Sequence, residues 1–163
     1  MRDSDFSKIY SDHREMVWKL VSRYVSGQHD REDLFQEVFV RVHKALPKFR
    51  GDSGIGSWIY RIAVNTSLNH LRKMKLRKGL SEALGMLALT GHQEDFPAEQ
   101  DGSALLRPLE KLNPRQRMIL ILSDVEERKL SEIAEMLNMS VGTVKSSLHR
   151  AREIVRKEVE KNG

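Results

Sequence analysis

The sequence predicts an all-α protein of two small helical domains joined by a flexible linker. Over most of the 163 residues, apolar side chains recur at helical spacing. Between two such parts, residues 79–103 contain five acidic and no basic residues, with glycines and a proline that break regular structure. The segments on either side, residues 1–78 and 104–163, carry net charges of +7 and +3. Two basic blocks around an acidic spacer favour a polyanionic partner such as nucleic acid.

The N-terminal part begins with two predicted amphipathic helices. The first covers residues 5–26, and the second runs to about Leu46, where Pro47 stops it. Gly27 is expected to end the first helix and Asp30 to cap the second. The apolar stripe of the first helix consists of Phe6, Ile9, Tyr10, Val17, Leu20, Val21 and Tyr24.

A polar loop over residues 47–54 leads into a third predicted helix, which starts near Ile55 or Ser57. The third helix is expected to end in the basic segment of residues 72–78. Apolar spacing over residues 80–89 allows one further short helix before the chain becomes a linker.

The C-terminal part is predicted to start with a short helix over residues 105–112. Asn113 and Pro114 then form a cap and a first turn, because proline fits the first helical position. The helix that follows is expected to cover residues 114–125.

Residues 131–152 fit a helix-turn-helix. Ser131 is expected to cap its first helix, and Ala134 is small enough to let a second helix cross closely. Asn138 occupies the turn, where a left-handed backbone is needed and asparagine tolerates it. Ser140 is expected to cap the second helix.

The second helix of this motif has a polar and basic outer face. Val144, Leu148 and Ala151 recur at helical spacing and are expected to point inward. Such a face suits a reader of the DNA major groove, in which Lys and Arg neutralise phosphates while Ser, Thr and His reach base edges. The candidate contacts with duplex DNA are Thr143, Lys145, Ser146, Ser147, His149 and Arg150.

Two blocks of the sequence together resemble the extracytoplasmic-function (ECF) group of bacterial sigma factors. Residues 33–73 resemble region 2 of that family, with the DLFQEVF opening, the FRGDS loop and the WIYRIAVN helix. Residues 112–122 and 131–152 resemble region 4. The order and the spacing of the blocks both fit this family.

The resemblance implies a protein that binds core RNA polymerase and directs promoter-specific initiation. It would recognise the −35 element as duplex and the −10 element as single-stranded DNA. Residues 1–78 would be region 2, residues 79–103 an acidic linker and residues 104–163 region 4. This linker is expected either to be a solubilising spacer or, as the resemblance implies, to thread the RNA channel of the polymerase, which is basic.

The resemblance further implies that the loop before the third helix forms a pocket for a base that leaves the stack. Asn65 and Asn69 are four residues apart, so both amides lie on one helix face and can read base edges. Trp58 is expected to pack in the core instead. The implied contacts with the −10 element are Arg41, Ala45, Phe49, Arg50, Gly51, Asp52, Ser53, Asn65 and Asn69.

Contact with the polymerase is expected from one stripe of the second helix. Its residues follow the spacing i, i+3, i+4, i+7 and i+8. In the family, this stripe meets the clamp helices of the largest polymerase subunit. The stripe consists of Asp33, Gln36, Glu37, Val40 and Arg41.

Two other functions compete with this interpretation. A DNA-binding regulator that never joins polymerase would explain the helix-turn-helix but not residues 33–69. An enzyme such as a nuclease would need a metal site or a phosphate loop. The six histidines have no ligand spacing, and no such loop is present. We therefore expect no catalytic activity, no cofactor and no metal.

The remaining expectations concern location and partners. The sequence has no cysteine, no apolar run of about 18 residues and no apolar core of a signal peptide near Met1. These features favour the cytoplasm and exclude insertion into a membrane. The resemblance adds an anti-sigma factor as a partner.

Overall fold

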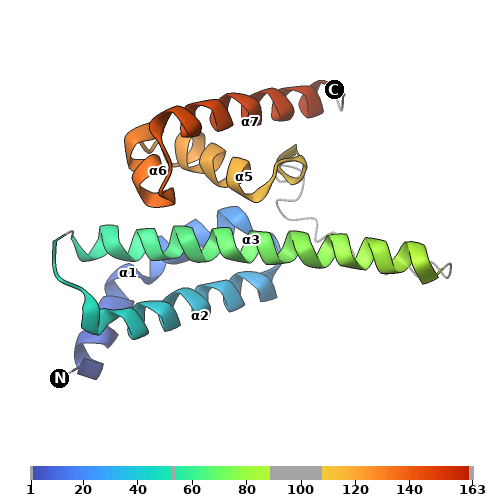
Figure 1. Cartoon of the computed structure of the whole chain (residues 1–163). Coiled ribbons are helices and arrows are strands. Elements are labelled where there is room, and N and C mark those ends of the chain that lie inside the picture. The colour runs from blue at the N-terminus through green and yellow to red at the C-terminus, as the bar shows by residue number, and fades with distance from the viewer. Residues whose placement is uncertain (1, 53, 89–107, 162–163) are drawn as a thin grey trace.

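The computed structural model describes residues 2–52, 54–88 and 108–161, and every regular element within them is a helix (Figure 1). An N-terminal bundle contains α1, α2 and α3, and a C-terminal unit contains the elements from η2 to α7. The elements are α1 (Arg2–Tyr24), α2 (Gln28–Ala45), η1 (Leu46–Lys48), α3 (Ile55–Ala88), η2 (Pro108–Lys111), α5 (Pro114–Leu120), η3 (Ile121–Val125), α6 (Leu130–Leu137) and α7 (Val141–Lys161).

The helices of the N-terminal bundle pack pairwise around a common core. The apolar stripe of α1 faces this core through Val17, Val21 and Tyr24, which are all buried. The opposing side chains come from α2 and α3, and the largest of them are Leu34, Val38, Val42 and Ile59. Periodicity therefore predicted the buried face of α1 correctly.

Helix α3 is longer than predicted. It runs without a break through the basic segment to Ala88, so the expected end at residues 72–78 and the separate helix over 80–89 are both wrong. Gly79 and Gly85 lie inside it, and each lowers helix stability by about 1 kcal/mol relative to alanine. The Leu, Lys, Glu and Ala residues around them favour helix strongly enough to continue it. The end of α3 projects beyond the other helices (Figure 1). Most of the expected linker, from residue 89 onwards, lies outside the described residues.

Three expected helix caps are wrong. Helix α1 ends at Tyr24, so Gly27 does not cap its end. Helix α2 begins one residue after Gly27, which is its N-cap with φ −78° and makes no side-chain hydrogen bond. Asp30 therefore lies in the first turn, where a carboxylate favours the positive end of the helix dipole. Helix α6 likewise begins at Leu130 with Lys129 as N-cap, so Ser131 is inside the helix.

The C-terminal unit starts with a well-formed cap. The Asn113 side chain accepts a hydrogen bond from the Gln116 backbone N–H at 2.8 Å, and Gln116 Oε1 accepts one from the Asn113 N–H at 3.1 Å. This confirms the expected cap. Of the expected helix over 105–112, the described part is a 3₁₀ turn, η2.

The helix expected over residues 114–125 changes type at Ile121. Helix α5 is followed by a turn of π-helix, η3, which is closed by a 3.0 Å hydrogen bond from the Glu126 N–H to the Ile121 carbonyl. The wider turn leads directly into a backbone with positive φ at Glu127. The chain thereby changes direction before α6.

The helix-turn-helix has the predicted geometry. Asn138 is left-handed, with φ 53° and ψ 53°, and the Met139 N–H donates to the Ala134 carbonyl at 2.9 Å. Ser140 Oγ accepts a 3.1 Å hydrogen bond from the Thr143 N–H, which confirms the cap of α7. The inward residues Val144, Leu148 and Ala151 are buried, as expected.

A bidentate ion pair between Arg152 and Asp124 holds α7 against η3. The Arg152 guanidinium donates to both carboxylate oxygens of Asp124, at 2.6 and 3.0 Å. These hydrogen bonds lower the pKa of Asp124 below its ordinary value. The pair therefore stabilises the folded state at pH values above the ordinary carboxyl pKa, and this contribution is lost as the pH falls through the lowered pKa of the folded state.

We predict that Asp124→Asn lowers the free energy of unfolding by about 0.5 kcal/mol at neutral pH, a small value because solvent screens the pair. Urea denaturation at several pH values measures it. The difference from wild type should shrink as the pH falls below the ordinary pKa of 3.8. A difference that stays constant with pH would contradict the assigned role of the carboxylate.

Candidate promoter and polymerase interfaces

The stripe predicted to meet polymerase lies on the outer side of α2. Four of its five residues are exposed and Glu37 is half-buried. Arg41 Nη2 lies 2.9 Å from Glu37 Oε1, so these two side chains hold each other in place along the helix. Val40 is 50% exposed, which is unusual for a valine on a bundle helix. The stripe thus combines charge with an uncovered apolar side chain.

A shallow apolar groove of about 400 Å³ lies beside this stripe. Phe6 and Tyr10 of α1 form one side of the groove, and Phe35 and Phe39 of α2 form the other. The aromatic rings pack edge to face, with the Tyr10 and Phe39 centroids 4.8 Å apart. Sequence analysis assigned Phe6 and Tyr10 only to a helix stripe. Both side chains lie in the first half of α1 and are half-buried.

The loop predicted to hold a flipped base joins η1 to α3. Gly51 has φ +78°, a backbone conformation that glycine adopts most easily. Arg50 and Asp52 are exposed, and Ser53 lies outside the described residues. The Phe49 ring packs on Trp58 with centroids 4.8 Å apart. Trp58 also packs against the core, in agreement with its expected role.

Asn65 and Asn69 are both half-buried on α3. The Asn65 amide Nδ2 donates to the carbonyl of Arg61 at 3.0 Å and to the carbonyl of Met136 at 3.3 Å. Because Met136 belongs to α6, a residue predicted to read DNA contacts the C-terminal unit. Nothing in the sequence pattern pointed to this contact, since 71 residues separate the two partners.

Asn65 is one of several residues that join the two parts of the chain. Arg61 Nη2 lies 3.0 Å from Glu135 Oε1, and the Arg128 guanidinium lies 4.1 Å from the centroid of the Tyr60 ring. In each contact, an arginine of one part of the chain faces a carboxylate or an aromatic ring of the other part. Tyr60, which is 5% exposed, is therefore part of this interface.

Two further contacts involve buried charged groups. Arg23 Nη1 lies 2.9 Å from Glu126 Oε1, and the burial of Glu126 raises the pKa of its carboxyl group. Arg117 Nη2 donates to the Tyr24 carbonyl at 2.8 Å, and burial lowers the pKa of this arginine. Burial thus disfavours the charged form of both groups, and their partners offset part of this effect.

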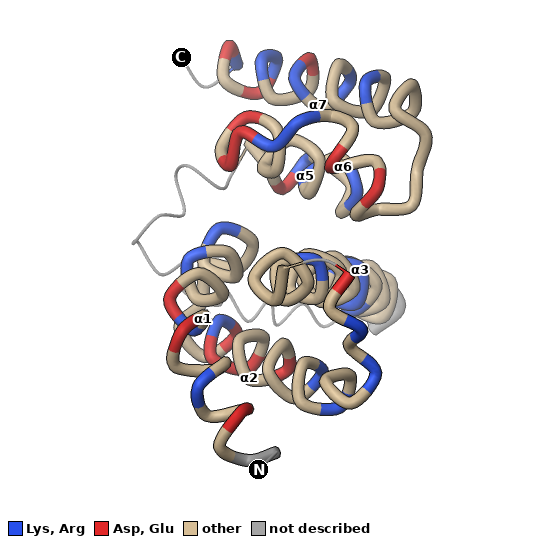
Figure 2. Tube along the Cα trace, turned by 90° about the vertical axis from the view of Figure 1, so that its left-hand side faces the viewer, with Lys and Arg blue, Asp and Glu red and all other residues tan. Residues whose placement is uncertain are grey.

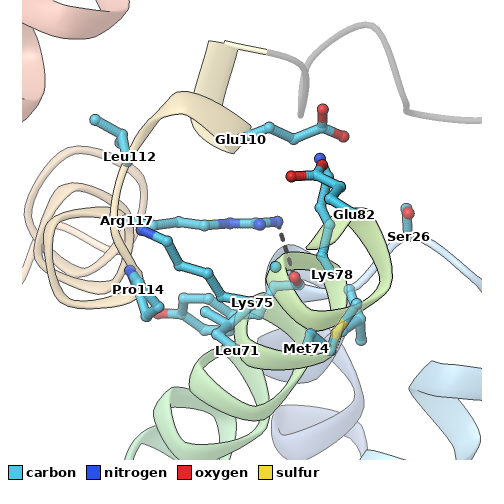
Figure 3. A pocket seen from close by; sticks show the side chains of 13 residues that line it. Ser26, Leu71, Met74, Lys75, Lys78, Glu82, Glu110, Leu112, Pro114 and Arg117 are labelled. Atoms are coloured by element: carbon cyan, nitrogen blue, oxygen red, sulfur yellow. Dashed lines mark hydrogen bonds between the residues drawn. The ribbon is translucent and has the colours of Figure 1, made fainter. Parts of the chain in front are cut away.

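A pocket of about 480 Å³ lies at one end of the interface (Figure 3). It is bounded by α3, α5 and the connection between α1 and α2. Figure 3 shows the Arg117 side chain extending across it, with Lys75 and Lys78 of α3 nearby and Glu82 and Glu110 on the far side. The buried Arg117 Nε has no hydrogen-bond partner there. The two parts of the chain are therefore incompletely packed at this end.

The face predicted to read the −35 duplex is largely exposed, unlike the half-buried asparagines of α3. Its residues on α7 are exposed, except for Ser147, which is half-buried. The Thr143 hydroxyl lies 2.7 Å from Ser140 Oγ and takes part in the cap. In both overall views, α5 and α6 lie between α7 and α3 (Figures 1 and 2). Helix α7 thus lies on the far side of the C-terminal unit, away from the N-terminal bundle.

Other classes of site find no support in the described part of the chain. None of its helices is both long enough and apolar enough to cross a membrane. No group of three or more metal-ligating side chains comes together among these residues.

Comparison with known families matches both parts of the chain. Residues 9–77 match Sigma-70 region 2, and residues 103–155 match Sigma-70 region 4. The first match spans the stripe of α2 and the asparagines of α3, and the second spans the helix-turn-helix. Both matches agree with the resemblance seen in the sequence.

Individual relatives extend this likeness over nearly the full length. The ECF RNA polymerase sigma factor SigW of Bacillus subtilis is 30% identical over 165 residues, which cover 94% of this chain and 88% of SigW. The ECF RNA polymerase sigma-E factor of Escherichia coli is 34% identical over 166 residues, which cover 95% of this chain and 86% of that protein.

Two solved structures share the fold. CnrH in complex with the cytosolic domain of CnrY has a TM-score of 0.68 at 20% identity, covering 99% of this chain and 91% of that one. The sigma factor RpoE in complex with the anti-sigma factor NepR from Bartonella quintana also has a TM-score of 0.68 at 20% identity, covering 96% and 97%. At this identity the likeness establishes the fold alone. Together with the relatives, the two family matches place this chain in the ECF group of bacterial RNA polymerase sigma factors, which direct promoter-specific initiation of transcription.

Proposed function

We propose that this sigma factor divides promoter recognition between its two parts. The outer face of α7 binds the −35 duplex, and the loop before α3, together with the asparagines of α3, binds the melted −10 strand. The stripe of α2 binds core polymerase. One observation carries this proposal: the −35 face and the polymerase stripe are exposed on helices at opposite ends of the stacked structure (Figure 2). DNA and polymerase can therefore be held at the same time.

The chemistry of each surface supports its assignment. The α7 face presents Lys145, His149 and Arg150 to solvent, and cations dominate contacts with phosphate. The loop before α3 carries Arg50 and a left-handed Gly51, which allows the backbone to approach a base closely. The apolar groove beside the α2 stripe offers a protein partner surface that DNA does not need.

The organisation of the chain follows from these roles. We propose region 2 over residues 1–78, an acidic linker over 79–103 and region 4 over 104–163. The chain recognises the promoter and binds the melted strand. Polymerase performs the chemistry, so the chain has no catalytic activity of its own. It acts in the cytoplasm, where its DNA and polymerase are found. The RpoE relative is seen with an anti-sigma factor, which supports a partner of the same class here.

Runoff transcription with core polymerase on genomic fragments tests the proposal. The variant to compare with wild type carries two substitutions in the polymerase stripe. We predict that Gln36→Ala combined with Glu37→Arg reduces specific transcripts by about tenfold or more, as loss of a central contact does. Co-elution with core polymerase should fall in parallel. Glu15→Arg on α1 reverses the same charge on an exposed helix face and serves as control. Normal assembly of the double variant would contradict the stripe, and a wild type without specific transcripts would contradict the function.

For the −35 face, we predict that Lys145→Ala and Arg150→Ala each weaken binding to the duplex. Each lost phosphate contact should reduce the slope of log K against log salt by about one unit. Fluorescence anisotropy over a salt series measures both quantities. Lys19→Ala in the N-terminal bundle controls for the change in net charge. Unchanged affinity and slope in both variants would contradict the assignment.

For the −10 face, we predict that Asn69→Ala spares −35 binding but impairs promoter opening by the holoenzyme. An amide that reads an unpaired base acts only after the strands separate, and its loss should cost about 1–3 kcal/mol by analogy with a base-reading pair. Permanganate footprinting of melted thymines detects the defect, and a pre-melted template should partly restore activity. Gln28→Ala removes an exposed amide elsewhere in the bundle and should have no effect. Full opening by Asn69→Ala would show that this amide is only a surface group.

A further inference from the structure

We propose that the 480 Å³ pocket beside Arg117 binds a small organic anion, of the class of monocarboxylates with an apolar body. None of the described residues that line this pocket belongs to the surfaces proposed above to bind DNA or polymerase. The pocket is therefore a further site of the chain, and it stands or falls independently of the proposed function.

The pocket has the size and the position of a small-molecule site. Its volume lies within the range of about 300–1,000 Å³ that ligand pockets occupy, and such pockets often lie where two domains meet. The connection between α1 and α2 and the start of the C-terminal unit supply two of its walls. The third wall is one face of α3, with helical spacing, and consists of Leu71, Met74, Lys75, Lys78, Gly79 and Glu82.

Apolar side chains from both parts of the chain line the pocket. Leu71 and Met74 come from α3, and Leu112 and Pro114 come from the C-terminal unit (Figure 3). Methionine is flexible and adapts its shape to a ligand. These walls favour a ligand with an apolar body, because binding removes apolar surface from water on both sides.

The charged group that the pocket offers to a ligand is Arg117, whose side chain extends across it (Figure 3). Its Nη2 donates to the Tyr24 carbonyl at 2.8 Å, but its buried Nε has no hydrogen-bond partner in the described part of the chain. Burial lowers the pKa of this arginine, and the nearby Glu110 offsets only part of this effect. A carboxylate oxygen gives the Nε an acceptor and compensates the buried charge. Lys75 adds a second cation to the same pocket.

The acidic residues of the pocket limit the ligand to one negative charge. Glu82 and Glu110 line the side opposite the body of Arg117 and repel any second anionic group. Together with Lys75, Lys78 and Arg117 they leave a net charge of +1 around the pocket. A monocarboxylate matches this charge, whereas a nucleotide or another multiply charged anion does not.

The test uses three probes that share one apolar body and differ in charge. These are 2-naphthoate with one negative charge, 2-naphthamide with none and 2,6-naphthalenedicarboxylate with two. Binding to the full chain is measured by saturation-transfer NMR and calorimetry. We expect 2-naphthoate to bind about tenfold more tightly than either other probe, the effect of one hydrogen bond to a charged group. Equal affinities for naphthoate and naphthamide, or no binding of naphthoate, would overturn the proposal.

Two matched substitutions on α3 locate the probe. A Cβ atom added at Gly79 or at Gly85 meets no atom within 4 Å, and leucine favours helix over glycine, so both Gly79→Leu and Gly85→Leu should fold. Only Gly79 lines the pocket. We expect Gly79→Leu to fill the pocket and to weaken naphthoate binding about tenfold or more, with Gly85→Leu unchanged. Equal affinities of the two variants would show that naphthoate binds elsewhere and would overturn the proposal.

A second pair of variants tests the charge without touching the apolar walls. Lys75→Gln removes an exposed cation of the pocket, and Lys73→Gln removes one from the same helix that does not line it. We expect Lys75→Gln to weaken binding of naphthoate about threefold but not that of naphthamide, and Lys73→Gln to change neither. The same loss in both variants would reveal only a general effect of net charge and would contradict an anion site in this pocket.

A thermal shift tests whether the ligand bridges the two parts of the chain. A ligand that binds the folded chain raises its Tm, and here it contacts walls from both parts. Saturating 2-naphthoate should therefore raise the Tm of wild type and of Gly85→Leu, but not that of Gly79→Leu. The same shift in all three proteins would contradict the assigned site, while transcription from promoters would remain as proposed.

Discussion

The whole arrangement depends on α3, a single helix that serves two groups of neighbours. Its inner side completes the core of the N-terminal bundle through Ile59, Ala63 and Val64, all fully buried. The same helix contacts both α5 and α6 of the C-terminal unit. The turns of α3 around Tyr60, Arg61 and Asn65 therefore lie close to both parts of the chain, whereas its last turns project beyond them. This constraint explains why a side chain suited to DNA can also find a protein partner.

The sequence predicted the elements well where one local signal decided the outcome. The apolar stripes of α1 and α2, the capping box at Asn113 and the left-handed Asn138 each depend on neighbours within a turn or two. The prediction from sequence was wrong where two alternative local structures were close in free energy. The helix continued through Gly79 because strong helix formers outweighed one glycine, and α5 changed to a π-turn at Ile121 because of hydrogen bonding that no periodicity reveals.

The candidate sites divide in the same way. The exposed stripe of α2 and the outer face of α7 follow from helical spacing, so their exposure could be predicted for all residues except Glu37 and Ser147, which are half-buried. The contacts of Asn65 with Met136 and of Tyr60 with Arg128 could not, because they join residues about 70 positions apart. Periodicity identifies which face of a helix is free of its own core, but it does not say which other helix lies against that face.

The length of α3 has a mechanical consequence. At 34 residues and about 1.5 Å per residue, it is a rod of roughly 50 Å with its far end projecting beyond the bundle. The residues proposed to read bases, Asn65 and Asn69, lie in the half of this helix nearer its start. A small tilt imposed on the projecting end is transmitted along the helix axis, since a continuous hydrogen-bonded helix bends little between its ends. The projecting turns thus form a lever arm, by which a force applied far from the proposed −10-binding loop can change the angle of the helix that follows this loop.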